Sequence, residues 1–195
     1  MRASDDGPAR SRELDLAPTS NDTLFPGGTV NETLRAMTLL GATATTGLGA
    51  GVFALYAHTI MPGLRTTDDR TFVGAFQAID RAIINPWFMI SAFVGPVVLT
   101  AAATVAHRGH PAFGWVAVAL GLFVVAVAVT VAVNVPLNDA IKAAGDPNQI
   151  GNLGLVRQRF HETRWASWNV LRVALTMASF GCLLWALVLH GRATK

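Results

Sequence analysis

The sequence contains very few charged residues and a single cysteine, and both shortages limit what the protein can be. Charged residues make up 14% of the 195 residues, hydrophobic residues make up 52%, and the mean hydropathy is +0.43. This composition excludes an ordinary soluble domain and indicates an integral membrane protein. The lone Cys182 excludes a disulfide framework and a thiolate metal cluster, and we interpret it as a small buried hydrophobic residue.

Signals for nucleic-acid and nucleotide binding are also missing. The net charge is +3, but the basic residues are dispersed, so we do not expect a nucleic-acid partner. The only lysines are Lys142 and Lys195, and the excess of arginine in an Ala-, Val- and Gly-rich chain indicates a GC-rich bacterial genome. Glycines occur at 47, 49 and 51 without a preceding strand, which excludes a nucleotide-binding loop. Gly47 and Gly51 instead form a GxxxG pattern that favours close helix packing.

Four apolar runs are long enough to cross a bilayer, which requires about 20 residues. They cover about residues 36–61, 86–106, 114–135 and 169–190. The predicted fold class is therefore all-α, a four-transmembrane-helix bundle with short amphipathic helices in the loops after the first and third spans. Residues 1–30 mix charges with Pro, Gly, Ser and Thr and are predicted to be a disordered tail, which leaves 31–195 as the transmembrane domain.

Basic residues near the spans are more numerous in the loops that follow the first and third spans than on the opposite side. The positive-inside rule places these loops in the cytoplasm and both termini outside. We therefore expect a protein of the bacterial cytoplasmic membrane, with the lipid bilayer as its surroundings. The sequence carries no signal for an oligomeric state.

Residues 65–85 have apolar residues at helical spacing and are predicted to form an amphipathic helix at the mouth of the bundle. The apolar side consists of Phe72, Phe76, Ile79 and Ile83. Gln77 and Arg81 share another side, with Asp80 adjacent. We interpret these three polar residues as a solvated, salt-bridged surface.

Prolines mark the start of the second span and a bend within it. Asn85 followed by Pro86 is typical of a helix N-cap with proline at the first helical position. Pro96 cannot donate a main-chain hydrogen bond and releases the carbonyl of Ala92, so we expect a kink. His58 lies near the end of the first span, where it could be an interfacial side chain or a catalytic base.

Pro136 is predicted to interrupt the helix between Asn134 and Asn138 at the end of the third span. Buried amides are costly unless they are hydrogen-bonded. The two asparagines could therefore cap broken helix ends or point into a cavity. His107 and His110 lie in the turn between the second and third spans, and with no third ligand nearby in the sequence we interpret them as part of a solvated turn.

The stretch RQRFHETRWASWNVLR, residues 157–172, is predicted to be a polar helix that continues without a break into the fourth span. At about 100° per residue, one face carries His161, Trp165, Trp168 and Arg172, with Asn169 beside them. Ionisable groups at a hydrocarbon boundary are functional candidates. In the alternative reading, the two tryptophans form an interfacial aromatic belt and Arg172 extends to lipid headgroups.

Three motifs occur in a fixed order: AIINPWF before the second span, NVPLN at the end of the third, and the 157–172 stretch before the fourth. Together they resemble the anthrone oxygenase-like integral-membrane family, long catalogued as a domain of unknown function, over roughly residues 36–190. Characterised members are described as cofactor-independent oxygenases that convert anthrones into anthraquinones during aromatic polyketide biosynthesis. The resemblance implies a planar aromatic substrate, dioxygen as co-substrate and no cofactor or metal.

The resemblance also implies a site. The expected catalytic residues are His161, His58, Arg172 and Asn169. The expected substrate-binding residues are Trp165, Trp168, Trp87, Asn134, Asn138, Asn85 and Arg157. One of the two histidines would act as base, arginine and amide groups would stabilise an enolate oxygen, and the indoles would hold the rings. The alternative is a non-catalytic membrane protein that binds a lipid or another hydrophobic small molecule, or serves as a structural or accessory subunit.

Overall fold

The computed structural model describes residues 27–193, with side chains from Asn31 onward. Residues 1–26 of the predicted tail lie outside the described residues. Residues 27–30, the last four positions of that tail, are helical. In chain order the helical segments are α1 (Gly27–Leu55), η2 (Tyr56–Ile60), α2 (Met61–Arg65), α3 (Asp69–Ile83), α4 (Pro86–Phe88), η3 (Met89–Val94), α5 (Gly95–Ala106), α6 (Phe113–Val129), η4 (Thr130–Asn134), α7 (Val135–Ala143), α8 (Leu153–Phe160) and α9 (Glu162–Ala193). The segments named η are π-helical.

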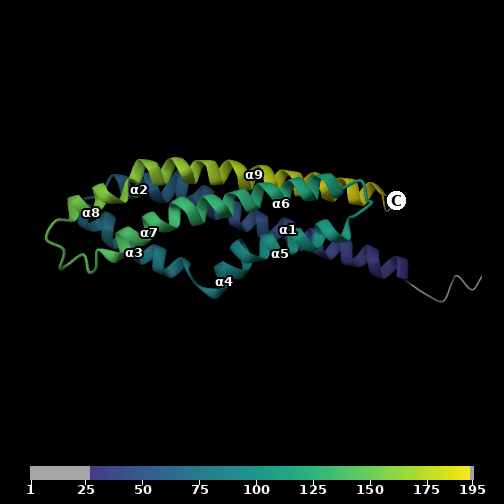
Figure 1. The fold of residues 1–195 in the computed structure, drawn as a ribbon, viewed down its shortest axis with the longest axis horizontal. Helices are drawn as coiled ribbons and strands as arrows, with labels where there is room; N and C mark the ends of the chain where they lie inside the picture. Colours follow the sequence, from purple (N-terminus) through teal and green to yellow (C-terminus); the bar gives the residue numbers. More distant parts are fainter. Residues whose placement is uncertain (1–26, 194–195) are drawn as a thin grey trace, which may run out of the picture.

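Four helical stretches of the described residues are long and apolar enough to cross a membrane, which confirms the predicted fold class. They run over Asn31–Arg65, Pro86–Ala106, Phe113–Ala143 and Leu153–Ala193. Figure 1 shows them side by side in an elongated bundle. Helix α1 packs against α5 and α9, and α6 also packs against α5 and α9. The beginning of α1 and the end of α9 lie at the same end of the bundle (Figure 1).

Each π-helical segment ends two residues before a proline. Pro62, Pro96 and Pro136 are each the second residue of the α-helical segment that follows. A proline has no N–H to donate and its ring collides with the carbonyl four residues earlier, so the backbone locally takes the wider π form. The predicted interruption at Pro136 is therefore a π-helical adjustment, and the third span continues to Ala143 rather than ending near residue 135.

Gly49 marks the closest approach between the first two spans. A Cβ atom at this position would lie 2.6 Å from the carbonyl oxygen of Ala92, the acceptor that Pro96 leaves without its usual donor. At the predicted GxxxG positions, a Cβ at Gly47 would lie 2.9 Å from the ring of Phe180, while Gly51 has nothing within 4 Å. Among the glycines of the first span, Gly49 thus has the tightest contact, and it lies between the two that the motif singled out.

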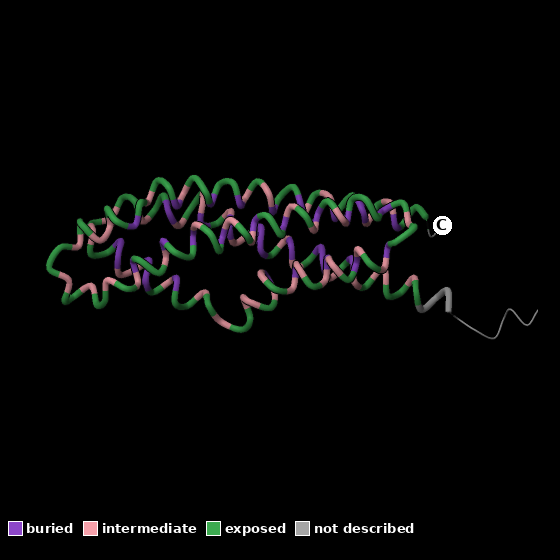
Figure 2. The backbone as a smooth tube through the Cα atoms, viewed as in Figure 1, coloured by how far each residue is buried: buried purple, intermediate pink, exposed green. Residues whose placement is uncertain are grey.

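The end of the bundle that contains α2, α3, α7 and α8 is closed by an aromatic core (Figure 1). Phe72 and Phe76 on α3 are buried against Phe160 of α8, with ring centres 5.8 and 4.5 Å away, respectively. Phe76 also meets Trp165 of α9 edge-on at 5.8 Å. The predicted amphipathic helix in residues 65–85 is confirmed, and its apolar side places α3 over the bundle mouth. Figure 2 shows that buried residues lie on the inner sides of the helices.

Candidate functional site

The inner face of α9 carries the predicted polar residues into the bundle. Trp165, Asn169 and Arg172 are 2%, 0% and 5% exposed, whereas Trp168, predicted on the same face, is 37% exposed. The predicted continuous helix over 157–172 is wrong, because it breaks at His161. That residue has the left-handed backbone angle φ 52°, ends α8 and leaves α9 to start at Glu162.

A cavity of about 220 Å³ lies between this face of α9 and the segments α1, η2, α3, α4, η3, η4 and α7. One water needs only about 10–15 Å³ of such space, so the cavity has room for a ligand. Most of its wall is aliphatic or aromatic, including Phe53, Phe76 and Phe93. The polar groups of the wall are contributed by Tyr56, Asp80, Thr130, Asn138, Trp165 and Arg172.

Arg172 is a buried cation held by neutral groups. Its Nη1 donates to Thr130 Oγ1 at 3.2 Å and its Nη2 donates to Asn169 Oδ1 at 2.7 Å. The guanidinium carbon lies 4.6 Å from the ring centre of Phe53 and 5.4 Å from that of Trp165. Its Nε is buried and has no hydrogen-bond partner, and no carboxylate within the described chain forms an ion pair with it. An anionic group in the cavity would therefore meet an uncompensated positive charge.

Asn169 serves Arg172 rather than the cavity itself. Its Nδ2 donates to the main-chain carbonyl of Phe53 at 3.1 Å, so both ends of the amide are occupied. Asn134 is likewise buried at 1% exposure, and its Nδ2 donates to the carbonyl of Trp165 at 3.3 Å. The side chain of Asn134 makes no helix-capping hydrogen bond, so it links the third and fourth spans.

A second polar group of the cavity, Asp80, was not singled out as a site residue by the sequence. Its Oδ1 accepts from Asn138 Nδ2 at 2.6 Å, and its Oδ2 pairs with Lys142 Nζ at 2.8 Å. The Oδ1 of Asn138 in turn accepts from Trp165 Nε1 at 2.7 Å. A continuous chain of polar contacts thus runs from Lys142 through Asp80 and Asn138 to the indole beside Arg172.

The solvated surface predicted for Gln77, Asp80 and Arg81 is therefore wrong for two of the three. Gln77 is 1% exposed and donates to the carbonyl of Ile141 at 2.7 Å, and Asp80 is 6% exposed. Helix α7 covers this side of α3. The sequence pattern of α3 does not show whether its polar side faces water or another helix, so it could not indicate that Gln77 and Asp80 are buried.

The two histidines expected to supply a base lie away from the cavity wall. His58 is exposed, and its Nδ1 contacts Thr59 Oγ1 at 2.6 Å. His161 is exposed in the break between α8 and α9 and borders an open surface depression together with Arg157 and Glu162. Neither imidazole shares a cavity with Arg172.

The remaining predicted residues have other surroundings. Asn85 is the N-cap of α4 and accepts from the amide of Phe88 at 3.0 Å, which confirms the predicted cap. Arg157 donates to the main-chain carbonyl of Thr67 at 2.9 Å and so ties α8 to the segment before α3. Trp87 is 78% exposed and, like Trp168, is absent from the cavity wall.

At the opposite end of the bundle, the turn between α5 and α6 is not a solvated turn as predicted. His107 is 0% exposed, and His190 from the end of α9 joins it and His110. Burial is the main reason that the pKa values of His107 and His110 are lowered, and nearby positive charge from Arg35 lowers them further. The third histidine comes from a distant part of the sequence, which is why the turn alone did not reveal it.

The fold and the mostly apolar cavity with its few buried polar groups define a helical membrane protein with a candidate binding site at one end of its bundle. Residues 86–182 match a family model described as anthrone oxygenase. The chain therefore belongs to the anthrone oxygenase-like family, which confirms the resemblance drawn from the motifs. The match begins at α4 and ends within α9, so it contains Asn138, Trp165 and Arg172 but neither α1 nor α3. No curated protein and no solved structure matches the chain.

Proposed function

We propose that this protein is a membrane-embedded oxygenase that converts an anthrone-like planar aromatic into a quinone, with dioxygen as co-substrate and no resident cofactor at the cavity. The observation that carries the proposal is Arg172, a buried cation with an unused Nε–H in the wall of a mostly apolar cavity. Such a wall suits an aromatic molecule that becomes an oxyanion. Family membership supports the same reaction class.

The first chemical step is loss of a proton from the ring carbon opposite the carbonyl. In our proposal the Asp80 carboxylate accepts this proton, because it is the acidic group of the cavity wall, and Asn138 holds it in place at 2.6 Å. The geometry favours Asp80 over His58 and His161, neither of which lines the cavity. The negative charge moves to the carbonyl oxygen, which the positive charge of the Arg172 guanidinium stabilises.

The resulting enolate transfers one electron to dioxygen, and the two radicals combine into a peroxide anion at the deprotonated carbon. This anion takes the proton back from Asp80 and becomes a hydroperoxide. Loss of the second hydrogen from that carbon breaks the O–O bond and releases water, which leaves the second carbonyl of the quinone. One anthrone and one dioxygen thus give one quinone and one water. Preorganised dipoles and a dry slot are all that the protein needs to supply.

The cavity also has a route for an apolar substrate in our proposal. Ile84 and Val131 are both part of its wall, and both are 60% exposed on the outside of the bundle. In a membrane these side chains face lipid, so an aromatic molecule dissolved in the bilayer reaches the cavity without crossing water. The aromatic rings of Phe53, Phe76 and Trp165 then offer faces and edges for stacking.

Oxygen uptake and quinone absorbance of the detergent-purified protein with a panel of anthrones test the proposal. The expected result is uptake above the spontaneous oxidation, with one dioxygen consumed per quinone formed. Heat-denatured protein in the same detergent is the control for background and for detergent effects. If no anthrone gives oxygen uptake above that background, the oxygenase proposal is wrong, and the alternative of a hydrophobic-ligand binder remains.

A further inference from the structure

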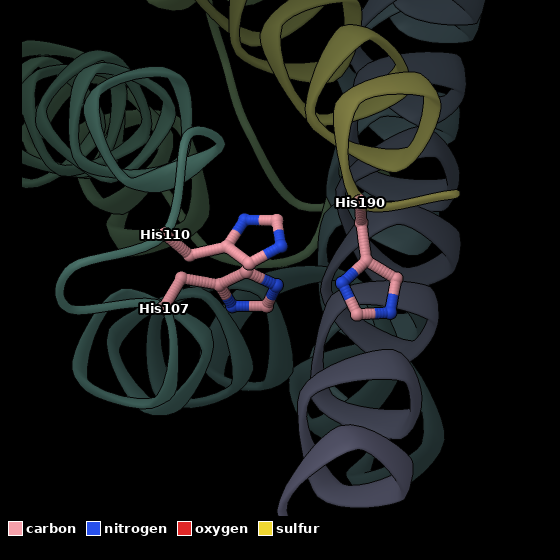
Figure 3. Close-up of side chains that lie close together, drawn as sticks. All are labelled: His107, His110 and His190. Atoms are coloured by element: carbon pink, nitrogen blue, oxygen red, sulfur yellow. The ribbon is translucent and has the colours of Figure 1, made fainter. Parts of the chain in front are cut away.

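Three imidazole rings face one another where the α5–α6 turn meets the end of α9 (Figure 3). The ring centres of His107, His110 and His190 are 5.3, 5.4 and 5.4 Å apart, an almost equilateral triangle. One nitrogen from each ring lies within 4.8 Å of the other two. Figure 3 shows a nitrogen of each ring directed into the shared space.

The hydrogen bonds of His107 favour metal ligation. Its Nδ1 contacts the carbonyl of Ala103 at 2.8 Å, and only a protonated Nδ1 can donate there. The lone pair of the neutral ring is therefore on Nε2, which is buried and has no hydrogen-bond partner. A carbonyl that fixes the tautomer of a ligating histidine is a regular feature of metal sites.

His110 has the opposite hydrogen bond. The amide of Ala112 donates to its Nδ1 at 3.1 Å, so the neutral ring carries its proton on Nε2. Nε2 is buried without a hydrogen-bond partner, and ligation by the neutral ring through this atom requires the proton to be on Nδ1 instead. Metal binding therefore exchanges one backbone hydrogen bond for a metal–nitrogen bond.

One ion pair lies beside the cluster. Arg35 is the cation that acts on His107 and His110, and it donates to the carbonyl of Ala106 at 2.8 Å. Glu32 pairs with Arg35 at 2.6 Å and offsets its charge. Neutral imidazoles without a carboxylate among them suit a borderline transition-metal ion rather than Mg²⁺ or Ca²⁺, which prefer oxygen ligands.

We infer that His107, His110 and His190 form a binding site for a transition-metal ion of the Zn²⁺ class. The three nitrogens are at most 4.8 Å apart, so an ion at the centre of their triangle would lie at most about 2.8 Å from each. Zn–N bonds are about 2.0–2.1 Å, so an inward shift of each side chain by at most about 0.7 Å brings the nitrogens to bonding distance. Three histidines leave the fourth position of a tetrahedral ion for water or another ligand. The site is at the opposite end of the bundle from the cavity, and it ties the α5–α6 turn to α9.

Metal content of the full-length chain measures this directly. Protein purified in detergent is stripped with a chelator, incubated with Zn²⁺ and desalted, and the metal per chain is then determined by mass spectrometry. Wild type should retain about one Zn²⁺ per chain, and His107→Gln or His190→Gln should retain less than about one tenth of that. His58→Gln is the matched control, because it removes an exposed histidine from the other end and should leave the content unchanged.

A second measurement needs only wild-type protein, in case the buried substitutions prevent folding. Co²⁺ bound by three nitrogens should give visible absorption bands that Zn²⁺ abolishes, and Zn²⁺ but not Mg²⁺ should raise the unfolding midpoint by at least about 3 °C. Absence of both responses in folded wild type, or equal Zn²⁺ content in wild type and the two variants, would overturn the inference. Quinone formation is not a readout here, so this result is independent of the proposed oxygenase activity.

Discussion

Replacing Arg172 with methionine should separate catalysis from stability. The substitution keeps an unbranched apolar stem of similar reach but removes the cation that we assign to the enolate oxygen. Loss of one preorganised oxyanion donor costs a factor of about 10²–10³ in turnover, or about 2.7–4 kcal/mol of barrier. We therefore expect Arg172→Met to form quinone at least about 100-fold more slowly than wild type.

The stability of this variant should change little, for two opposing reasons. Asn169 Oδ1 loses its 2.7 Å partner, and an unpaired buried acceptor costs about 1–3 kcal/mol. Against this, the change removes a buried guanidinium that has no carboxylate partner among the described residues, and replacing buried charge by apolar volume is often neutral or stabilising. The net change should be within about 2 kcal/mol, or a few degrees in the unfolding midpoint.

The assay compares initial rates of quinone formation with the unfolding midpoint of the same detergent sample. Arg192→Met serves as the control, because it removes an exposed arginine at the opposite end of the bundle and should keep the wild-type rate. A rate for Arg172→Met within about threefold of wild type would remove Arg172 from the mechanism. A collapse of both rate and midpoint would show that its role is structural.

A companion change tests whether Asn169 acts through Arg172. Asn169→Leu should slow turnover by about tenfold, a smaller loss than that in Arg172→Met. The guanidinium remains in this variant but loses one of its two hydrogen bonds. The double variant should be no slower than Arg172→Met alone, since a positioning residue has no effect once its target is gone. Multiplicative losses in the double variant would instead indicate that the amide contributes independently.

Three further predictions concern the base and the helix packing. Asp80→Asn keeps the shape and hydrogen-bonding reach of the side chain but cannot accept the substrate proton, so quinone formation should fall by a factor of about 10²–10⁴, measured by absorbance. His58→Ala and His161→Ala should each stay within about threefold of the wild-type rate because neither imidazole lines the cavity, and a large loss in either would restore that histidine as the base. Gly49→Ala should lower the unfolding midpoint through a clash worth about 1–3 kcal/mol, while Gly51→Ala, with open space around its Cβ position, should not.

Hydropathy and local caps predicted the bundle because these signals are contained in single segments. The four apolar runs and the Asn85 cap needed no knowledge of what lies opposite them. Asp80 could not be assigned in that way, since the polar side of an amphipathic helix has the same pattern whether it faces water or another helix. Here α7 lies against it and supplies Asn138 and Lys142 as its partners. The resemblance named Asn138 as a site residue but did not name Asp80.

The break at His161 and the cluster around His190 were missed for a related reason. A left-handed residue at a helix end is usually glycine, so a histidine in that conformation carries no local signal. His190 reaches the α5–α6 turn only because the spans that carry them are neighbours in the bundle. The apolar periodicity of lipid-facing helices does not specify which spans are neighbours. Both features depend on tertiary contacts.

Helix α9 explains why the most informative stretch of the sequence was polar. In water a helix buries its apolar stripe, but lipid is as apolar as leucine, so membrane helices associate through packing and polar contacts. The inner face of α9 follows this rule: Asn169 bonds α1, Arg172 bonds the third span, and Ser179 donates to the carbonyl of Ala119 at 2.8 Å. The same stripe ends in His190 at the far end. One polar face can therefore both hold the bundle together and supply the polar groups of a site. The atoms that it leaves without a hydrogen-bond partner, such as Arg172 Nε, distinguish the site from a packing contact.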